Sequence, residues 1–359
     1  MNQSKIRQSN FELLRIVCMV YIIGIHIMTQ TDAGLLRYDA GINYVFLVFF
    51  SYGGRLACNC YVMIGAWFLT ESKFKAEKIL NLWLEIFFYT TIITLLCLFC
   101  NVGNANIVTL VQAFFPVFGR PVWFPAEYIC MLLLSPFMNK LLDTNIVACR
   151  KILIILGTLI IGCASLFPIE HTTPAFSELV WFCFLYFLVG YWKAKPRKFC
   201  SQGKKCWVLF GIIYMFLCVV YMILVNMGIE QLKQIANYYR NHYETLLAFA
   251  SSVYLFYAMK NTHIPQSRLI NGIGGATFSV YLIHQTPAFY PYLWNGIFHV
   301  NKYVETKFFF LYMIMVELVL FVGCMPIDRG RKWIFIHAIE GSKAYKKIAK
   351  VINQFMYME

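Results

Sequence analysis

The sequence predicts an all-α integral membrane protein, a bundle of about ten transmembrane helices with both termini in the cytoplasm. Of its 359 residues, 60% are hydrophobic and only 13% are charged, whereas soluble domains carry roughly 25% charged residues. Apolar runs of membrane-spanning length recur from one end of the sequence to the other. This distribution excludes a soluble domain held by a single membrane anchor.

A helix needs about 20 mainly apolar residues to cross a bilayer. Ten segments meet this requirement: residues 11–30, 43–69, 79–100, 121–142, 151–168, 178–193, 206–228, 243–260, 274–298 and 307–327. The segment 107–118 is apolar but too short to span, so we expect a surface or re-entrant piece there. No small-residue cleavage site follows the first run, which favours an uncleaved span over a secretory signal.

Basic residues set the expected orientation of the bundle. Of the 31 Lys and Arg residues, 24 lie in the N-terminus, in every second connection and in the tail, whereas five lie in the opposite connections. Cytoplasmic segments of membrane proteins are rich in Lys and Arg, so the larger set is assigned to the cytoplasm. The net charge of +14 is therefore interpreted as a topology signal, and no nucleic-acid partner is expected.

The tail, residues 329–359, is predicted to form a basic amphipathic helix after a membrane domain that covers residues 1–328. At helical spacing, its apolar positions are Tyr345, Ile348, Ala349, Ile352, Phe355 and Met356, and its basic positions are Lys343, Lys346, Lys347 and Lys350. Such a helix suits the surface of an anionic cytoplasmic leaflet. A charged tail that only fixes orientation explains the composition equally well.

The cysteines give no indication of a metal or disulfide site. Most of the 13 lie within apolar runs, and no CxxC pair is present. Buried cysteine behaves as a small hydrophobe, so we expect no metal, no disulfide framework and no permanently bound cofactor. The sequence also lacks GxSxG, P-loop, HExxH and dinucleotide-binding motifs, which removes the chemistries that those motifs carry.

Two ionisable residues share one face of the first predicted helix. Arg15 and His26 are eleven positions apart, which corresponds to about three helical turns and roughly 16 Å along the axis. Arg15 is expected near the cytoplasmic mouth and His26 deeper in the membrane. This spacing suits an elongated ligand with an anionic head and a reactive far end, as in acyl-CoA. Alternatively, Arg15 is a topology anchor and His26 an interior hydrogen-bonding residue.

A second polar stripe lies in the ninth segment. Thr277, Tyr281 and His284 recur at i, i+4 and i+7, so they share one helix face. A stripe of this kind normally points into a bundle. It is interpreted either as part of a site or as an interhelical hydrogen-bond seam.

Together these features resemble acyltransferase family 3, the multispanning bacterial membrane O-acyltransferases that modify surface polysaccharides. The likeness covers nearly the whole chain, and its most specific part is the Arg15-to-His26 spacing, preceded by Glu12. Three further motifs follow in the family's order: Trp123-Phe124 with Tyr128 and residues 134–139, Thr277 to His284, and Ile327-Asp328-Arg329.

Two positions depart from the family pattern. Residues 64–67 stand where the family often has a Phe-rich Ser-Gly stretch, and Lys75 and Lys78 stand where it often has paired arginines. Lysine still neutralises phosphate, but it lacks the bidentate geometry of arginine. These departures bear on the donor site more than on family membership.

The resemblance implies a multi-pass protein of the bacterial inner (plasma) membrane. It would transfer an acyl group, most simply acetyl, from acetyl-CoA or another acyl-CoA to a hydroxyl of a surface polysaccharide or its lipid-linked precursor. The implied catalytic residues are His26 as general base, Glu12, His284 and Tyr281. The implied donor-binding residues are Arg15, Lys75 and Lys78. The expected partners are acyl-CoA, the glycan acceptor and membrane lipids.

Two other classes of protein also fit many spans with ionisable residues. One is a transporter or flippase for a small anion or a lipid-linked sugar, although the sequence shows no internal repeat of the kind common in transporters. The other is a structural subunit of a glycan-assembly complex, with the tail as a docking element. Acyl transfer by the purified chain alone would exclude the second.

Overall fold

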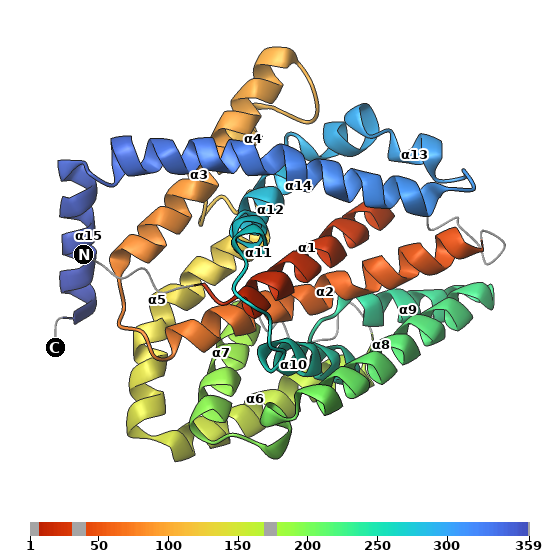
Figure 1. Ribbon diagram of the computed structural model, residues 1–359, viewed down its shortest axis with the longest axis horizontal. Coiled ribbons are helices and arrows are strands. Elements are labelled where there is room, and N and C mark those ends of the chain that lie inside the picture. The colour runs from red at the N-terminus through yellow and green to blue at the C-terminus, as the bar shows by residue number, and fades with distance from the viewer. Residues whose placement is uncertain (1–6, 31–40, 169–177, 358–359) are drawn as a thin grey trace. The chain divides into compact units, whose positions relative to one another are not determined.

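The computed structural model describes residues 7–30, 41–168 and 178–357, which form helices and connections but no strand. Figure 1 shows the helices, and their contacts divide the chain into two compact units. The first unit contains α1 (Ser9–Gln30), α2 (Ile42–Leu69), α6 (Ile146–Leu166), α7 (Glu178–Ala194), the 3-10 turn η3 (Lys198–Ser201), α8 (Gly203–Asn226), α9 (Glu230–Asn241), α10 (Leu246–Lys260), α11 (Arg268–Gly274) and α13 (Val300–Tyr303). The second contains α3 (Ala76–Cys100), α4 (Ile107–Phe114), most of α5 (Trp123–Thr144), α12 (Thr277–Gln285), the π-helical turn η4 (Tyr292–Ile297), most of α14 (Phe309–Ile334), the π-helical turn η5 (Phe335–Ile339) and α15 (Lys343–Tyr357).

Six helices in the described residues are long and apolar enough to cross a membrane, namely α1, α2, α3, α6, α8 and α14 extended through η5. The predicted class of multi-pass, all-helical membrane protein is therefore confirmed. Helix α7 has 17 residues and α10 has 15, fewer than the about 20 that a perpendicular span needs. The count of ten spans and the cytoplasmic position of the termini stay predictions.

The ninth predicted segment is interrupted. Helix α12 ends before Pro287, and Thr286 at its end is extended with ψ of 119°. A proline lacks the amide hydrogen that a helix needs and forces the preceding residue out of the helical conformation. A second proline, Pro291, precedes the π-helical turn η4. The expectation of one continuous helix over residues 274–298 is therefore wrong, although both prolines were visible in the sequence.

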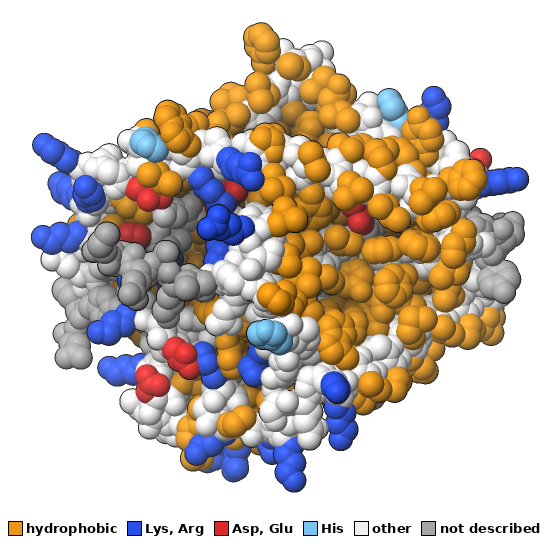
Figure 2. All heavy atoms as spheres, in the orientation of Figure 1, with side chains coloured by type: hydrophobic (Ala, Val, Ile, Leu, Met, Phe, Trp, Pro, Cys, Tyr) orange, Lys and Arg blue, Asp and Glu red, His pale blue; other side chains and the backbone are white. Residues whose placement is uncertain are grey.

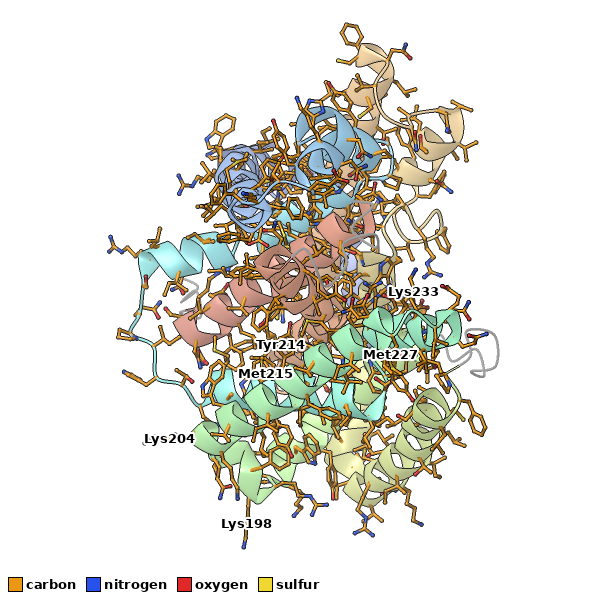
Figure 3. The ribbon with its side chains drawn as sticks, turned by 90° about the vertical axis from the view of Figure 1, so that its right-hand side faces the viewer. Lys198, Lys204, Tyr214, Met215, Met227 and Lys233 are labelled. Atoms are coloured by element: carbon orange, nitrogen blue, oxygen red, sulfur yellow. The ribbon has the colours of Figure 1, made fainter. Side chains whose placement is uncertain are left out.

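Apolar side chains lie exposed along several of the long helices. On α8, the exposed positions Val208, Ile212, Met215, Val219 and Ile223 recur at helical spacing. Figure 3 shows α8 with Lys198 and Lys204 near one end and Met227 and Lys233 beyond the other. Helix α14 likewise exposes hydrophobic side chains along its length (Figure 2). Stripes of this kind suit contact with lipid tails rather than with water.

Three glycines allow α1 and α2 to approach each other closely. A Cβ added at Gly53 would lie 2.4 Å from the Tyr21 ring, and one at Gly54 would lie 2.4 Å from Ile25. One added at Gly24 would lie 2.8 Å from Phe50 Cβ. Small residues at such contacts are typical of membrane helices, where close backbone packing replaces the hydrophobic effect as the source of association. This contact sets the position of α1 in the first unit.

We expect Gly53→Val to destabilise the protein by about 1–3 kcal/mol, because the added methyl groups overlap the Tyr21 ring in a packed interface. The measurement is the thermal unfolding midpoint in detergent. The control is Gly211→Ala on α8, where an added Cβ meets nothing within 4 Å and helix propensity improves. Equal midpoints for the two variants would contradict the close α1–α2 contact.

The predicted amphipathic tail helix forms as α15, and it packs on the first turns of α3. The Tyr345 hydroxyl donates to Asn81 Oδ1 at 2.6 Å, and the Ala76 backbone amide donates to Asn353 Oδ1 at 2.9 Å. Burial raises the pKa of Tyr345 above its usual value. The other side of α15 exposes apolar side chains: Ile348, Val351 and Phe355. A helix is therefore present in the tail as predicted, and its contact with a membrane surface stays a prediction.

Candidate functional site

The N-terminal turns of α1 hold a charge cluster around Glu12. Glu12 is buried, and its carboxylate accepts from Arg15 Nη1 at 2.6 Å and from Arg7 Nη1 at 3.2 Å. A Cβ on Gly274 would lie 2.7 Å from the Glu12 side chain, so α11 covers the carboxylate closely. The Arg15 side chain remains 26% exposed. Glu12 thus holds one edge of a guanidinium that belongs to a partly exposed side chain.

Neighbouring helices fix the start of α1 in place. The Asn10 amide donates to the backbone oxygens of Met259 and Lys260 at 3.2 and 3.0 Å, and so satisfies carbonyls at the end of α10. The Tyr61 hydroxyl, from α2, donates to the backbone oxygen of Arg15 at 2.8 Å. These bonds limit the movement of the turn that carries Arg15.

His26 lies three turns further along the same continuous helix. No helix break separates Arg15 from His26, so the predicted in-phase spacing of roughly 16 Å along the axis is kept. His26 is partly exposed, whereas its neighbours Ile25 and Ile27 are buried. An accessible imidazole at this place on α1 can exchange a proton with a bound ligand.

Helix α12, in the second unit, brings Tyr281 and His284 together. Their ring centroids are 5.9 Å apart in an edge-to-face arrangement, and the Trp294 ring lies 6.2 Å from that of His284. His284 is fully buried, with Nδ1 2.6 Å from the Val280 backbone oxygen. A carbonyl oxygen only accepts, so Nδ1 carries the proton, and in the neutral ring Nε2 is the acceptor. Thr277 is buried on the same helix.

Lys75 and Lys78 lie at the start of α3, also in the second unit. Both are exposed, and Lys78 Nζ donates to Ser72 Oγ at 3.2 Å. Helix α15 adds Lys346 and Lys350, which line a groove of about 510 Å³ along the start of α3. In the sequence these two lysines belong to the tail, and their position beside α3 was not predicted. Their connection is tertiary, so no local pattern could have indicated it.

The second unit contains a buried charge network that the sequence did not predict. Ser279 Oγ lies 2.6 Å from Asp328 Oδ1 and 3.0 Å from Glu85 Oε1. Arg331 Nη2 lies 2.8 Å from Asp328 Oδ1 and 3.1 Å from Glu85 Oε1, and Lys332 Nζ pairs with Asp328 Oδ2 at 2.5 Å. The network joins α3, α12 and α14. The i, i+3 spacing of Asp328 and Arg331 was the signal available in the sequence.

We expect Arg331→Ala to destabilise the protein by about 3–5 kcal/mol, because it leaves the buried Asp328 and the partly buried Glu85 without the cation that they share. The Arg331 side chain is only 6% exposed, so water cannot replace it. The thermal midpoint in detergent measures the loss. Lys332→Ala is the matched control, since Lys332 is 42% exposed and its removal should cost far less. Indistinguishable midpoints for the two variants would argue against a central role for Arg331.

Comparison with known proteins adds one match. A family model described as an acyltransferase domain matches residues 8–328, which is nearly the whole chain. The matched range includes Glu12 and Arg15 on α1, all of α12 and Asp328 at its end. No curated protein and no solved structure matches the chain.

Proposed function

The chain belongs to the acyltransferase family whose model covers residues 8–328, and on this premise we propose that it is a membrane O-acyltransferase. Its donor is acyl-CoA, most simply acetyl-CoA, taken from the cytoplasm. Its acceptor is a hydroxyl of a surface polysaccharide or of the lipid-linked precursor, and its location is the bacterial inner membrane. The family and the apolar helices together indicate a multi-pass membrane acyltransferase.

The observation that carries the proposal is the arrangement of Arg15 and His26 on α1. Glu12 holds one edge of the Arg15 guanidinium at 2.6 Å, and a partly exposed guanidinium suits a phosphate oxygen. Roughly 16 Å along the axis lies the imidazole. An extended acyl-CoA has phosphates at one end and a thioester at the other, so its length and charge match this face.

In the proposed reaction, His26 removes the proton from the acceptor hydroxyl as the oxygen attacks the thioester carbonyl. The tetrahedral intermediate collapses with cleavage of the C–S bond, and the imidazolium returns its proton to the leaving CoA sulfur. The Tyr281 hydroxyl donates a hydrogen bond to the oxyanion, and His284, whose neutral ring accepts at Nε2, orients the acceptor hydroxyl. Arg15 binds phosphate, with Lys75 and Lys78 as further cations.

Transfer of labelled acyl groups tests the proposal. Membranes that contain the chain, and matched membranes that lack it, are incubated with radiolabelled acetyl-CoA and the host's glycan fraction. Label in glycan only when the chain is present, removable by mild alkali as an ester would be, supports O-acyl transfer. No label with verified folded protein, across acetyl-, propionyl- and butyryl-CoA, would contradict the choice of short acyl-CoA as donor.

A transporter or flippase stays the second candidate because the segment around α12 is interrupted. Broken helices of this kind often line substrate sites in transporters. Movement of a labelled lipid-linked sugar or small anion across proteoliposomes that hold the purified chain, without acyl-CoA, would favour this function. Transfer that depends on acyl-CoA, without transport, would favour the acyltransferase.

A further inference from the structure

Arg240, on the last turn of α9, is a buried cation with no acidic partner among the residues that the structure describes. The residue is 9% exposed. Its Nη1 lies 3.0 Å from the Tyr221 hydroxyl and 2.9 Å from Met28 Sδ. In the part of the chain that the structure describes, no carboxylate pairs with it, and its buried Nε has no hydrogen-bond partner. The cation is therefore held by two neutral groups, one of them a weak thioether acceptor.

Burial of a guanidinium that is paired only with neutral groups costs folding free energy. The end of α9 favours a cation through the helix dipole, and the Tyr221 ring lies 5.3 Å from the guanidinium carbon. Neither contact supplies an acceptor for Nε or a negative charge. Ionisable residues placed among membrane helices normally have a partner or a function. An anion bound by Arg240 would satisfy both the charge and the unused donor.

An apolar groove is lined by Met222, the residue that follows Tyr221, the hydrogen-bond partner of Arg240. It has a volume of about 640 Å³ and lies between the start of α2 and the end of α8. Val219, Ile223 and Met227 line it, with Tyr44 and Asn226 as its polar members. The Tyr44 side chain also interacts electrostatically with Arg240. The groove is at the end of α8 marked by Met227 in Figure 3, opposite to Lys198 and Lys204.

We propose that Arg240 and this groove form a binding site for a phosphate-bearing membrane lipid. The phosphate accepts hydrogen bonds from the guanidinium, and a hydrocarbon chain lies in the groove past Tyr44. Exposed apolar side chains on α8 continue from the groove along the helix, so a lipid chain enters without crossing a polar surface. The site lies on α2, α8 and α9 and does not depend on the proposed acyl transfer.

Lipid binding by the purified full chain in a neutral detergent tests the site. Native mass spectrometry follows titration with dioleoyl phosphatidic acid, with dioleoylglycerol, which lacks the phosphate, and with inorganic phosphate. We expect saturable binding of phosphatidic acid and clearly weaker binding of the other two. Arg240→Gln should raise the dissociation constant for phosphatidic acid roughly tenfold to a hundredfold, the range for a charge-assisted hydrogen bond. Ile223→Trp, which fills the groove, should also weaken lipid binding.

The matched control is Lys233→Gln, on the same helix but 42% exposed, and it should bind as the wild type does. Equal affinity of Arg240→Gln and wild type would overturn the site. Inorganic phosphate that binds as tightly as phosphatidic acid, with no effect of Ile223→Trp, would indicate a free-phosphate site and overturn the lipid assignment. If Arg240→Gln fails to fold, the wild-type comparison of the two lipids and the Ile223→Trp variant decide the question.

Discussion

Replacement of His26 by alanine is expected to lower the rate of acyl transfer by roughly one hundredfold to ten-thousandfold, the contribution of a general base. The acceptor hydroxyl is a poor nucleophile until its proton is removed, and His26 is the partly exposed imidazole on the face of α1 that carries Arg15. The decrease should appear in kcat and not in KM, because the imidazole acts in the transition state and contributes little to donor binding. Initial rates with labelled acetyl-CoA at several donor concentrations measure both constants.

The matched control is His337→Ala, since His337 is also a histidine but is exposed in the π-helical turn η5. Its variant should transfer acyl groups at the wild-type rate. Membrane insertion and the thermal midpoint of His26→Ala should stay near those of the wild type, so that the loss reports chemistry. A correctly inserted and active His26→Ala variant would remove the general-base role from the mechanism.

Replacement of Arg15 by glutamine is expected to raise the KM for acyl-CoA roughly tenfold to a hundredfold, because a phosphate loses a charge-assisted hydrogen bond. The KM of Arg15→Lys should lie between those of the wild type and Arg15→Gln, since lysine keeps the charge but loses the planar fork of the guanidinium. The kcat at saturating donor should change far less than the KM. A shorter donor that lacks the phosphates, such as an acylated pantetheine, should be used equally well by the wild type and both variants.

Arg7 provides the control for this prediction. It is the other cation on Glu12, at 3.2 Å, but its side chain is 50% exposed. Arg7→Gln should leave the KM for acyl-CoA near the wild-type value while it disturbs Glu12 in a similar way. Equal increases in KM for Arg7→Gln and Arg15→Gln would mean that the Glu12 cluster acts on folding or position and that Arg15 does not bind the donor.

The long, strongly apolar helices could be predicted from the sequence because their signal is local. Predicted spans over residues 11–30, 43–69 and 79–100 agree with α1, α2 and α3 to within three residues at each end. The in-phase spacing of Arg15 and His26 is equally local, since it depends only on an unbroken helix. The prediction of a continuous helix over residues 274–298 was wrong because the segment is hydrophobic enough to span but contains Pro287 and Pro291. The effect of these prolines on the backbone is also local.

The sequence by itself determined the all-helical membrane class, the family, and the face of α1 that carries Arg15 and His26. It did so because hydropathy and helical phase are properties of consecutive residues. Only the tertiary structure decided the covering of the Glu12 carboxylate by α11, the network around Arg331, and the burial of Arg240. Each of these depends on which helices pack together, and a charge buried by distant segments carries no mark of its burial in the neighbouring sequence.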